Sequence, residues 1–207
     1  MANGDSSLFA LVECMKAKAP EYLDLMAAQS DAEFEKAFDV LLEKALHHLE
    51  SNSKNFAVLD ENGLTAVLAA ALSVPGLSVC QEANSNGHVD ITIHADHCFP
   101  MRKKLGEAKI YSGPDYHLKG VGQLLVRYTT GRESRGLVIA YVRQRNIKAL
   151  FEKIRVKMDA DLPEDQQGKT MDHPCRWNFL SKHMHSSGVV LEVAHAGCNL
   201  YFTDASA

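Results

Sequence analysis

The hydrophobic pattern first changes its period at Pro75-Gly76, and this change limits the folds that the chain can adopt. Before this turn signal, apolar residues recur every three or four positions, which is typical of amphipathic helices. After it, apolar residues alternate with polar ones or form short buried runs, which is typical of strands. The sequence therefore predicts a helical N-terminal part followed by an α/β part.

Three helical segments are expected in the N-terminal part. Their ranges are 6–28, 31–52 and 60–72. Pro20 is expected to break or kink the first helix, because proline removes a backbone donor and clashes with the preceding turn. Ser30, with Glu33 three positions later, predicts the N-cap of the second helix. We expect residues 1–55 to form a helical extension and residues 56–207 to form the main domain.

The second part of the chain predicts the order β-β-β-α-β-α-β-β. The expected strands are 77–82, 89–93, 105–111, 136–142, 188–194 and 198–203, and the expected helices are 115–130 and 145–158. Residues 84–87, Asn-Ser-Asn-Gly, have the composition of a tight turn between antiparallel strands. This order predicts an α/β fold with helices around a small mixed sheet.

The net charge of −4 conceals a strong asymmetry between the two parts of the chain. Between Arg102 and Lys157 there are 14 Lys and Arg against 4 Asp and Glu, a net +10. Between Met1 and Glu61 there are 5 Lys against 12 Asp and Glu, a net −7. Such an asymmetry is typical of a protein that presents a basic face to a polyanion. Salt bridges between the two parts are the alternative.

Cysteine usage and hydropathy bear on the compartment. No run approaches the roughly 20 apolar residues that a membrane helix needs, and the N-terminus has no signal-peptide pattern. The five cysteines are Cys14, Cys80, Cys98, Cys175 and Cys198. They are scattered and form no C-x-x-C pair, so we expect reduced thiols in a cytoplasmic protein. The single tryptophan, Trp177, is expected in the core, with a base-stacking surface as the alternative.

Asp90 and the tripeptide Glu107-Ala108-Lys109 carry the clearest chemical signal. Residues two apart on a strand share a face, so Glu107 and Lys109 project together. If the strand of Asp90 is a neighbour, two carboxylates lie side by side and repel each other, and a hard cation such as Mg²⁺ relieves the repulsion. Lys109 can then orient a water or stabilise a phosphate. The set predicts metal-assisted hydrolysis of a phosphodiester.

Other candidate residues bracket this set. Glu61 opens a helix before the strands and Glu82 ends the first strand, so either carboxylate can hold a second metal or a metal-bound water. The candidate nucleic-acid contacts are Gln123 and Arg127 on the helix after the E-x-K strand, and Arg145 and Lys148 near the start of the basic helix. Lys and Arg neutralise backbone phosphates without reading sequence. A solvated helix face is the alternative for the basic helix.

The stretch from Asp60 to Val142 resembles the PD-(D/E)xK, or restriction-endonuclease-like, phosphodiesterase superfamily. The resemblance is carried by Glu61 in Asp-Glu-Asn-Gly-Leu-Thr, Glu82 in Gln-Glu-Ala, Asp90 in Gly-His-Val-Asp-Ile, and Glu107 with Lys109 in Gly-Glu-Ala-Lys-Ile. It implies a restriction-endonuclease-like core, a central mixed sheet flanked by helices. It also implies that Asp90 and Glu107 bind Mg²⁺ or Mn²⁺, that Lys109 serves the attacking water, and that Glu61 assists the metal or the water.

The chain departs from the family pattern at two places. Gly87-His88 stands where many relatives have Gly-Arg. One subgroup separates a Gln and a Tyr after the E-x-K strand by three residues, whereas four residues separate Gln123 and Tyr128 here. At most one of these two side chains is therefore expected to keep the usual facing.

These observations predict a metal-dependent nuclease that hydrolyses phosphodiester bonds of DNA, with RNA as a further substrate option. Analogy with small stand-alone nucleases points to bacterial anti-phage defence or DNA processing. The N-terminal helices are the expected surface for a homo-oligomer or a protein partner. The alternative is a catalytically silent nucleic-acid- or protein-binding module on the same fold, which a buried, metal-free pair of Lys109 and Glu107 would favour. A third reading is a metalloenzyme or regulator built on the C-terminal His/Cys cluster.

Overall fold

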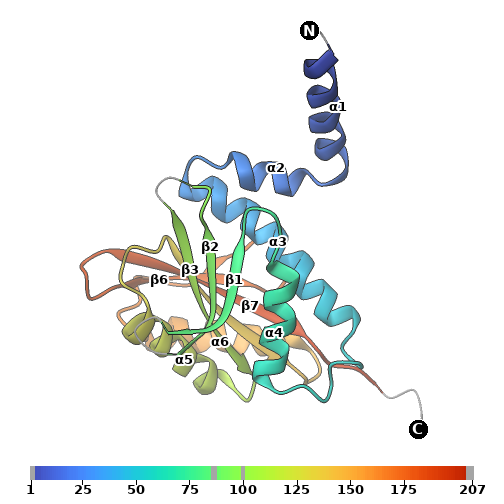
Figure 1. Ribbon diagram of the computed structural model, residues 1–207. Coiled ribbons are helices and arrows are strands. Elements are labelled where there is room, and N and C mark those ends of the chain that lie inside the picture. The colour runs from blue at the N-terminus through green and yellow to red at the C-terminus, as the bar shows by residue number, and fades with distance from the viewer. Residues whose placement is uncertain (1–2, 85–87, 99–100, 204–207) are drawn as a thin grey trace.

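The computed structural model describes residues 3–84, 88–98 and 101–203, which form one seven-stranded sheet with helices on both faces, as Figure 1 shows. The helices are α1 (Asn3–Lys18), α2 (Pro20–Ala27), α3 (Asp31–Ser51), α4 (Glu61–Leu72), α5 (Pro114–Gln123), the π-helical turn η1 (Leu124–Tyr128) and α6 (Ile147–Asp161). The strands are β1 (Ser78–Asn84), β2 (His88–Ala95), β3 (Arg102–Ile110), β4 (Arg135–Val142), β5 (Met171–Asp172), β6 (Phe179–Met184) and β7 (Val190–Asn199).

The sheet is mixed, which confirms the predicted α/β class. Its strand order is β1-β2-β3-β4-β7-β6-β5. The central strands β3, β4 and β7 run parallel to one another, and the outer pairs are antiparallel. The helical connections after β3 and β4 cover the sheet, as parallel strands require.

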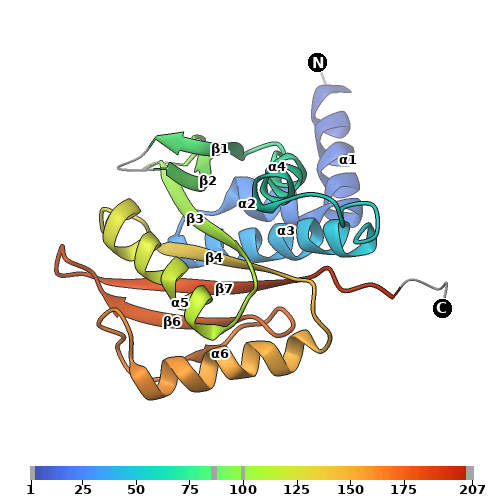
Figure 2. The ribbon, with the colours of Figure 1, turned by 90° about the horizontal axis from the view of Figure 1, so that it is seen from below.

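Figure 2 shows helices on opposite faces of the sheet, and the helices of each face bury separate cores. The larger core lies between the sheet and α2, α3 and α4, where Phe38 and Leu68 are buried together with Tyr141 of β4. On the other face, α5 and η1 bury Val121 and Tyr128, and α6 buries its own apolar side. Helix α3, part of the segment expected as an extension, thus shares its core with the sheet.

Local signals account for the helix ends. Helix α1 ends at Lys18 and α2 begins at Pro20, which confirms the predicted break. The side chain of Ser30 accepts a hydrogen bond from the amide of Glu33 at 3.3 Å, and the Glu33 carboxylate accepts one from the Ser30 amide at 3.0 Å. This capping box confirms the predicted start of α3. Helix α1 itself projects from the body, with Leu8 62% and Phe9 68% exposed (Figure 1).

The prediction for the last two strands is wrong. The segments 188–194 and 198–203 were expected as a pair, but β7 is one strand over Val190–Asn199 and its antiparallel partner is β6, Phe179–Met184. Residues 194–198 of β7 are covered on both faces, so this strand shows no apolar–polar alternation. In β6 the inward positions Ser181 and His183 are polar, which hides the strand period. The predicted turn after Asn84 falls on residues 85–87, outside the described residues.

Part of the charge asymmetry is cancelled by salt bridges between the acidic and basic parts. The pairs are Arg102 Nε with Asp31 Oδ1 at 2.9 Å, Lys104 Nζ with Glu35 Oε2 at 2.6 Å, and Arg135 Nη1 with Asp39 Oδ2 at 2.9 Å. Each joins α3 to β3 or β4, so these three cations tie the acidic helix to the sheet and present no free charge to a polyanion. For these three residues, the alternative that salt bridges between the two parts cancel the charge is confirmed.

Two further expectations concern cysteines and membranes. The cysteines are free, with Cys98 and Cys198 buried. Among the described residues, no helix combines the length and the apolar character needed to span a lipid bilayer.

Candidate active site

Strands β2 and β3 approach closely and then separate next to the candidate residues. Their register ends at Ile91 opposite Gly106. A Cβ atom at position 106 would lie 2.5 Å from Cγ2 of Ile91, so only glycine fits where the strands meet. Beyond this contact, the edge of β3 that faces β2 is open to other hydrogen-bond partners.

Two carboxylates accept hydrogen bonds from the backbone amides along the open edge of β3. Oδ2 of Asp90 accepts a hydrogen bond from the amide of Ala108 at 2.8 Å. Oε2 of Glu61 accepts one from the amide of Ile110, also at 2.8 Å. Asp60 caps α4 and so places Glu61 in the first turn of that helix. Carboxylates from β2 and α4 are therefore fixed side by side along β3.

Lys109 lies at the centre of these carboxylates. Its Nζ is 2.5 Å from Oε1 of Glu107, 3.6 Å from Oε1 of Glu61 and 4.0 Å from Oδ2 of Asp90. The structure thus brings together four residues that the sequence separates by up to 48 positions: Glu61, Asp90, Glu107 and Lys109. We call this group the carboxylate–lysine cluster.

Burial determines the charge behaviour of Glu107 and Lys109. Glu107 is 1% exposed, and burial raises its pKa to about 7 against the opposing pull of the Lys109 ammonium. The negative charges of Asp90 and Glu61 act in the same direction as burial. Burial works to lower the pKa of Lys109, but the surrounding carboxylates outweigh it and the pKa is raised. Oε2 of Glu107 is buried and has no hydrogen-bond partner among the described residues.

Helix α5 covers the stems of Glu107 and Lys109. A Cβ atom at Gly120 would lie 3.3 Å from Cγ of Glu107 and 3.6 Å from Cγ of Lys109. Glycine at this position lets the helix backbone press on both side chains and restrict their rotamers. Tyr128 of η1 is buried on the same face, where burial raises its pKa and the charges of Glu107 and Asp90 act in the same direction.

The π-helical turn changes the expected facing of Gln123 and Tyr128. The amide of Thr129 bonds to the carbonyl of Leu124 at 3.1 Å, five residues back. A π-turn therefore absorbs the extra residue, because residues five apart lie one turn apart in it. Tyr128 is buried and Gln123 is half-buried, and the π-turn shifts Tyr128 from the α-helical position that the spacing assumes.

The remaining predicted residues are Glu82, whose backbone alone is described, and three exposed cations away from the cluster. Glu82 lies between Gln81 and Ala83, which pair with Ile91 and Val89, so its backbone is level with that of Asp90. Its side chain is outside the described part of the structure. The other three are exposed: Arg127 on η1, Arg145 after β4, where its Nε bonds to the Tyr201 hydroxyl at 2.7 Å, and Lys148 in the first turn of α6.

Sequence reasoning gave Arg143 no individual role, although it lies beside the cluster. Its guanidinium donates a short hydrogen bond to the carbonyl of Leu59, two residues before Glu61. It ties the end of β4 to the start of α4 and so helps to position the Glu61 carboxylate. Its place directly after a buried strand is the signal that could have found it.

The donor set of the cluster suits a hard divalent cation. Asp90, Glu107 and Glu61 offer carboxylate oxygens, which Mg²⁺ and Mn²⁺ prefer, and the free Oε2 of Glu107 is an unused acceptor. Among the described residues, no group of three His, Cys, Asp or Glu side chains is arranged to hold a metal ion. Mg²⁺ is commonly held by only one or two carboxylates, with water and substrate phosphate completing its shell. Asp90 and Glu107 are therefore sufficient by number and chemistry.

Several C-terminal histidines form a buried hydrogen-bonded chain. Nε2 of His117 is 2.9 Å from Nδ1 of His195, whose Nε2 is 2.8 Å from the Ser181 hydroxyl. That hydroxyl is 2.7 Å from Nε2 of His183, whose Nδ1 contacts the carbonyl of Glu164. Burial lowers the pKa of all three histidines, that of His117 to about 4. These rings join α5, β6 and β7 as neutral hydrogen-bonding groups.

Searches of protein-family models, curated proteins and solved structures find no match to this chain. The assignment of function therefore depends on the arrangement of residues described above.

Proposed function

We propose that this chain is a metal-dependent nuclease with a restriction-endonuclease-like fold, and that it hydrolyses phosphodiester bonds of DNA. The observation that carries the proposal is the carboxylate–lysine cluster at the point where β2 and β3 separate. Three carboxylates around one ammonium leave surplus negative charge at a partly open strand edge. A divalent cation and a phosphodiester together complement such a site.

Asp90 and Glu107 hold the cation in this proposal, and Glu61 assists from α4. The bound metal supplies Lewis acidity and lowers the pKa of a coordinated water. Glu107 enters its ionised form near pH 7, because its pKa is about 7 before any cation binds. Asp90 is kept in place by the Ala108 amide, so its orientation does not depend on the metal.

Lys109 acts on the attacking water and on the charge that develops on the phosphate. Its ammonium stays protonated at neutral pH, because the three carboxylates raise its pKa. A protonated ammonium can donate hydrogen bonds to water and to phosphate oxygens but cannot accept a proton. Its role is therefore to orient and stabilise, with the water's proton leaving by another group or to solvent.

Phosphate contacts away from the cluster fall to exposed polar residues in this proposal. Gln123 is the last residue of α5, which covers Glu107, and Arg127 lies in the following η1, while Arg145 and Lys148 follow β4. Contacts of this kind add affinity without sequence specificity. The exposed apolar residues of α1, Leu8 and Phe9, form the proposed surface for self-association or a protein partner.

The test is a cleavage assay on supercoiled plasmid, linear duplex, single-stranded DNA and RNA. Each substrate is incubated with the wild type in Mg²⁺, Mn²⁺ or EDTA, and with Asp90→Asn as the site variant. Metal-dependent products from a DNA substrate, lost in EDTA and in Asp90→Asn, support the proposal. Cleavage that persists in EDTA or in Asp90→Asn contradicts it.

One observation favours the second candidate, a silent binding module. Lys109 and Glu107 already form a 2.5 Å pair with Glu107 buried, so the metal-free cluster is partly satisfied on its own. A silent module binds nucleic acid or a protein with equal affinity in Mg²⁺ and EDTA and yields no products. A nuclease yields products, and its DNA affinity increases with a divalent cation.

A further inference from the structure

Trp177 is held in a fixed position on the backbone of β7. Its indole Nε1 donates a hydrogen bond to the carbonyl of Gly197 at 3.1 Å. The amide of Gly197 in turn donates to Oδ1 of Asn178 at 2.9 Å. Trp177 also has a left-handed backbone conformation, with φ of 51°, which a bulky residue adopts only when its surroundings enforce it. The half-buried indole is thus held in one orientation, although the backbone conformation of Trp177 is unfavourable.

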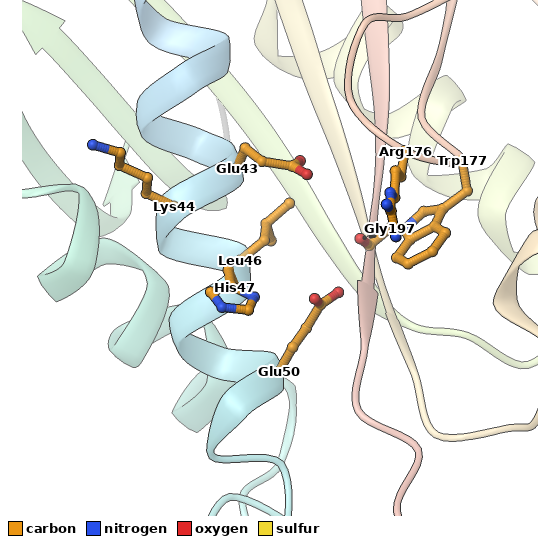
Figure 3. A pocket seen from close by; sticks show the side chains of 8 residues that line it. All are labelled: Glu43, Lys44, Leu46, His47, Glu50, Arg176, Trp177 and Gly197. Carbon is orange, nitrogen blue, oxygen red and sulfur yellow. Dashed lines mark hydrogen bonds between the residues drawn. The ribbon is translucent and has the colours of Figure 1, made fainter. Parts of the chain in front are cut away.

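Two cavities of opposite character meet at Trp177. Figure 3 shows the first, about 350 Å³, where Glu43 and Glu50 of α3 face Trp177 and Arg176. The second, about 600 Å³, lies between Trp177 and α6. Its volume is within the range of small-molecule and nucleotide sites. In the first cavity, the carboxylates of Glu43 and Glu50 offset the positive charges of Lys44 and Arg176, so it attracts an anion less strongly.

The α6 cavity has an aromatic wall and free cations. Phe151 and Trp177 line it, and Lys148 and Arg176 lie on its rim. Neither cation makes a hydrogen bond or ion pair with a described residue, whereas the third, Arg155, is bound to Asp172 at 2.8 Å. Glu152 is the one lining carboxylate that has no ion pair within the described part of the chain.

We propose that the α6 cavity binds one unpaired nucleotide of a single-stranded nucleic acid. The base stacks on Trp177, and its phosphate lies at Lys148 and Arg176. Aromatic rings that stack bases next to Lys and Arg are the usual means of holding single strands. The inference rests on the proposed function for the class of its ligand, and it adds a binding site that the carboxylate–lysine cluster does not include.

The register connects this cavity with the cluster. Lys109 of β3 pairs with Ala140 of β4, and Ala140 pairs with Gly197 of β7, to which Trp177 is bonded. Two strand spacings, about 10 Å, therefore separate the backbones of Lys109 and Gly197. Lys148 follows the parallel strand between them. A single strand held at the cluster reaches Trp177 within a few nucleotides.

Trp177 is the only tryptophan of the chain, so its fluorescence reports on a ligand in either of the two cavities that it lines. The experiment titrates the full chain in EDTA with a 12-nucleotide single strand, its duplex and inorganic tripolyphosphate. We expect saturable quenching by the single strand, weaker quenching by the duplex and none by tripolyphosphate.

Variants that remove charges test whether the charged residues of the α6 cavity contribute to binding. Combining Lys148→Ala with Arg176→Ala should weaken binding at least tenfold and reduce its salt dependence, since two phosphate contacts are lost. Glu152→Gln should tighten binding two- to fivefold by removing a nearby negative charge. Glu43→Gln, in the other cavity of Figure 3, is the matched control and should leave affinity unchanged.

The outcomes separate this inference from the proposed function. Metal-dependent DNA cleavage without quenching by the single strand overturns the nucleotide site and leaves the nuclease proposal intact. Quenching that the variants alter as stated, without cleavage by the wild type, supports the nucleotide site and favours the silent binding module. Quenching that is equal in the Lys148→Ala/Arg176→Ala variant, or equal with tripolyphosphate, overturns the site.

Discussion

Nζ of Lys109 lies 2.5 Å from Oε1 of Glu107, although the two residues are separated by only Ala108 on β3. The pair faces α5, where Gly120 presses on both stems. Asp90 and Glu61 reach the same ammonium from β2 and α4. One lysine therefore balances only part of the negative charge of three carboxylates, which is the condition that a divalent cation relieves.

The first prediction concerns Glu107 in the absence of metal. Its pKa of about 7 exceeds the ordinary 4.5, so the folded chain keeps a proton that the unfolded chain releases. The associated stability is complete below pH 4.5 and is lost as the pH rises through 7. Between pH 5 and pH 8, the free energy of unfolding of Glu107→Gln should therefore rise by about 2 to 3 kcal/mol relative to that of the wild type. Urea unfolding in EDTA measures this difference.

The exposed Glu13 supplies the control for that series. Glu13→Gln should differ from the wild type by a small amount that does not change with pH. A stability difference for Glu107→Gln that stays constant from pH 5 to pH 8 contradicts the assignment of a raised pKa to Glu107.

The second prediction concerns the buried histidine chain, whose effect has the opposite sign. Burial lowers the pKa of His117 to about 4, so its contribution to stability is present above pH 6.5 and is lost as the pH falls toward 4. Replacing His117 by Gln should reduce the loss of stability between pH 7 and pH 5 by about 2 kcal/mol. His47→Gln, on the exposed side of α3, should leave the acid sensitivity as it is.

The third prediction tests the close approach of β2 and β3. Gly106→Ala places a methyl group 2.5 Å from Cγ2 of Ile91 and should cost about 1 to 3 kcal/mol. Ile91→Ala removes that atom but leaves a cavity, at a cost of about 2 to 5 kcal/mol. The double variant should lose less stability than the sum of the two single-variant losses, because the added methyl group fills part of the cavity. Strict additivity would rule out the contact.

The fourth prediction compares a buried salt bridge with an exposed one. Lys104 and Glu35 are both buried and 2.6 Å apart, so Lys104→Met leaves the buried carboxylate with only the Ser134 hydroxyl at 2.7 Å and Arg135 Nη1 at 3.5 Å, and should cost about 3 kcal/mol. Lys16→Met breaks the exposed pair with Glu13 and should cost less than about 0.5 kcal/mol. Thermal unfolding of both variants checks the contrast, and equal shifts would contradict it.

Sequence periodicity predicted most elements because each has one apolar face and one polar face. The stripe of α3, the capping box at Ser30 and the alternation of β2 are local signals, and the structure follows them. The positions of the last two long strands, β6 and β7, were not predictable in this way. Strand β7 is covered on both faces and β6 turns Ser181 and His183 inward, so neither shows the apolar–polar pattern of a half-buried strand.

The candidate site was predictable as a set of residue types, but its geometry was not. Spacing on one strand placed Glu107 and Lys109 together. The positions of Asp90 and Glu61 depend on backbone amides that become free only where β2 leaves β3, which is a property of the register. The π-turn over Leu124–Tyr128 is likewise a feature that spacing alone does not reveal.

The most direct measurement of the central claim is the rate of plasmid cleavage in Mg²⁺ by the wild type, Lys109→Ala and Lys36→Ala. Lys36 is an exposed lysine on α3, across the sheet from α5, and serves as the matched control. We predict a loss of about 100-fold or more in Lys109→Ala, provided that urea unfolding shows this variant to be folded, and a rate within twofold of wild type in Lys36→Ala. Equal cleavage by Lys109→Ala, or none by the wild type in Mg²⁺ or Mn²⁺, would contradict it.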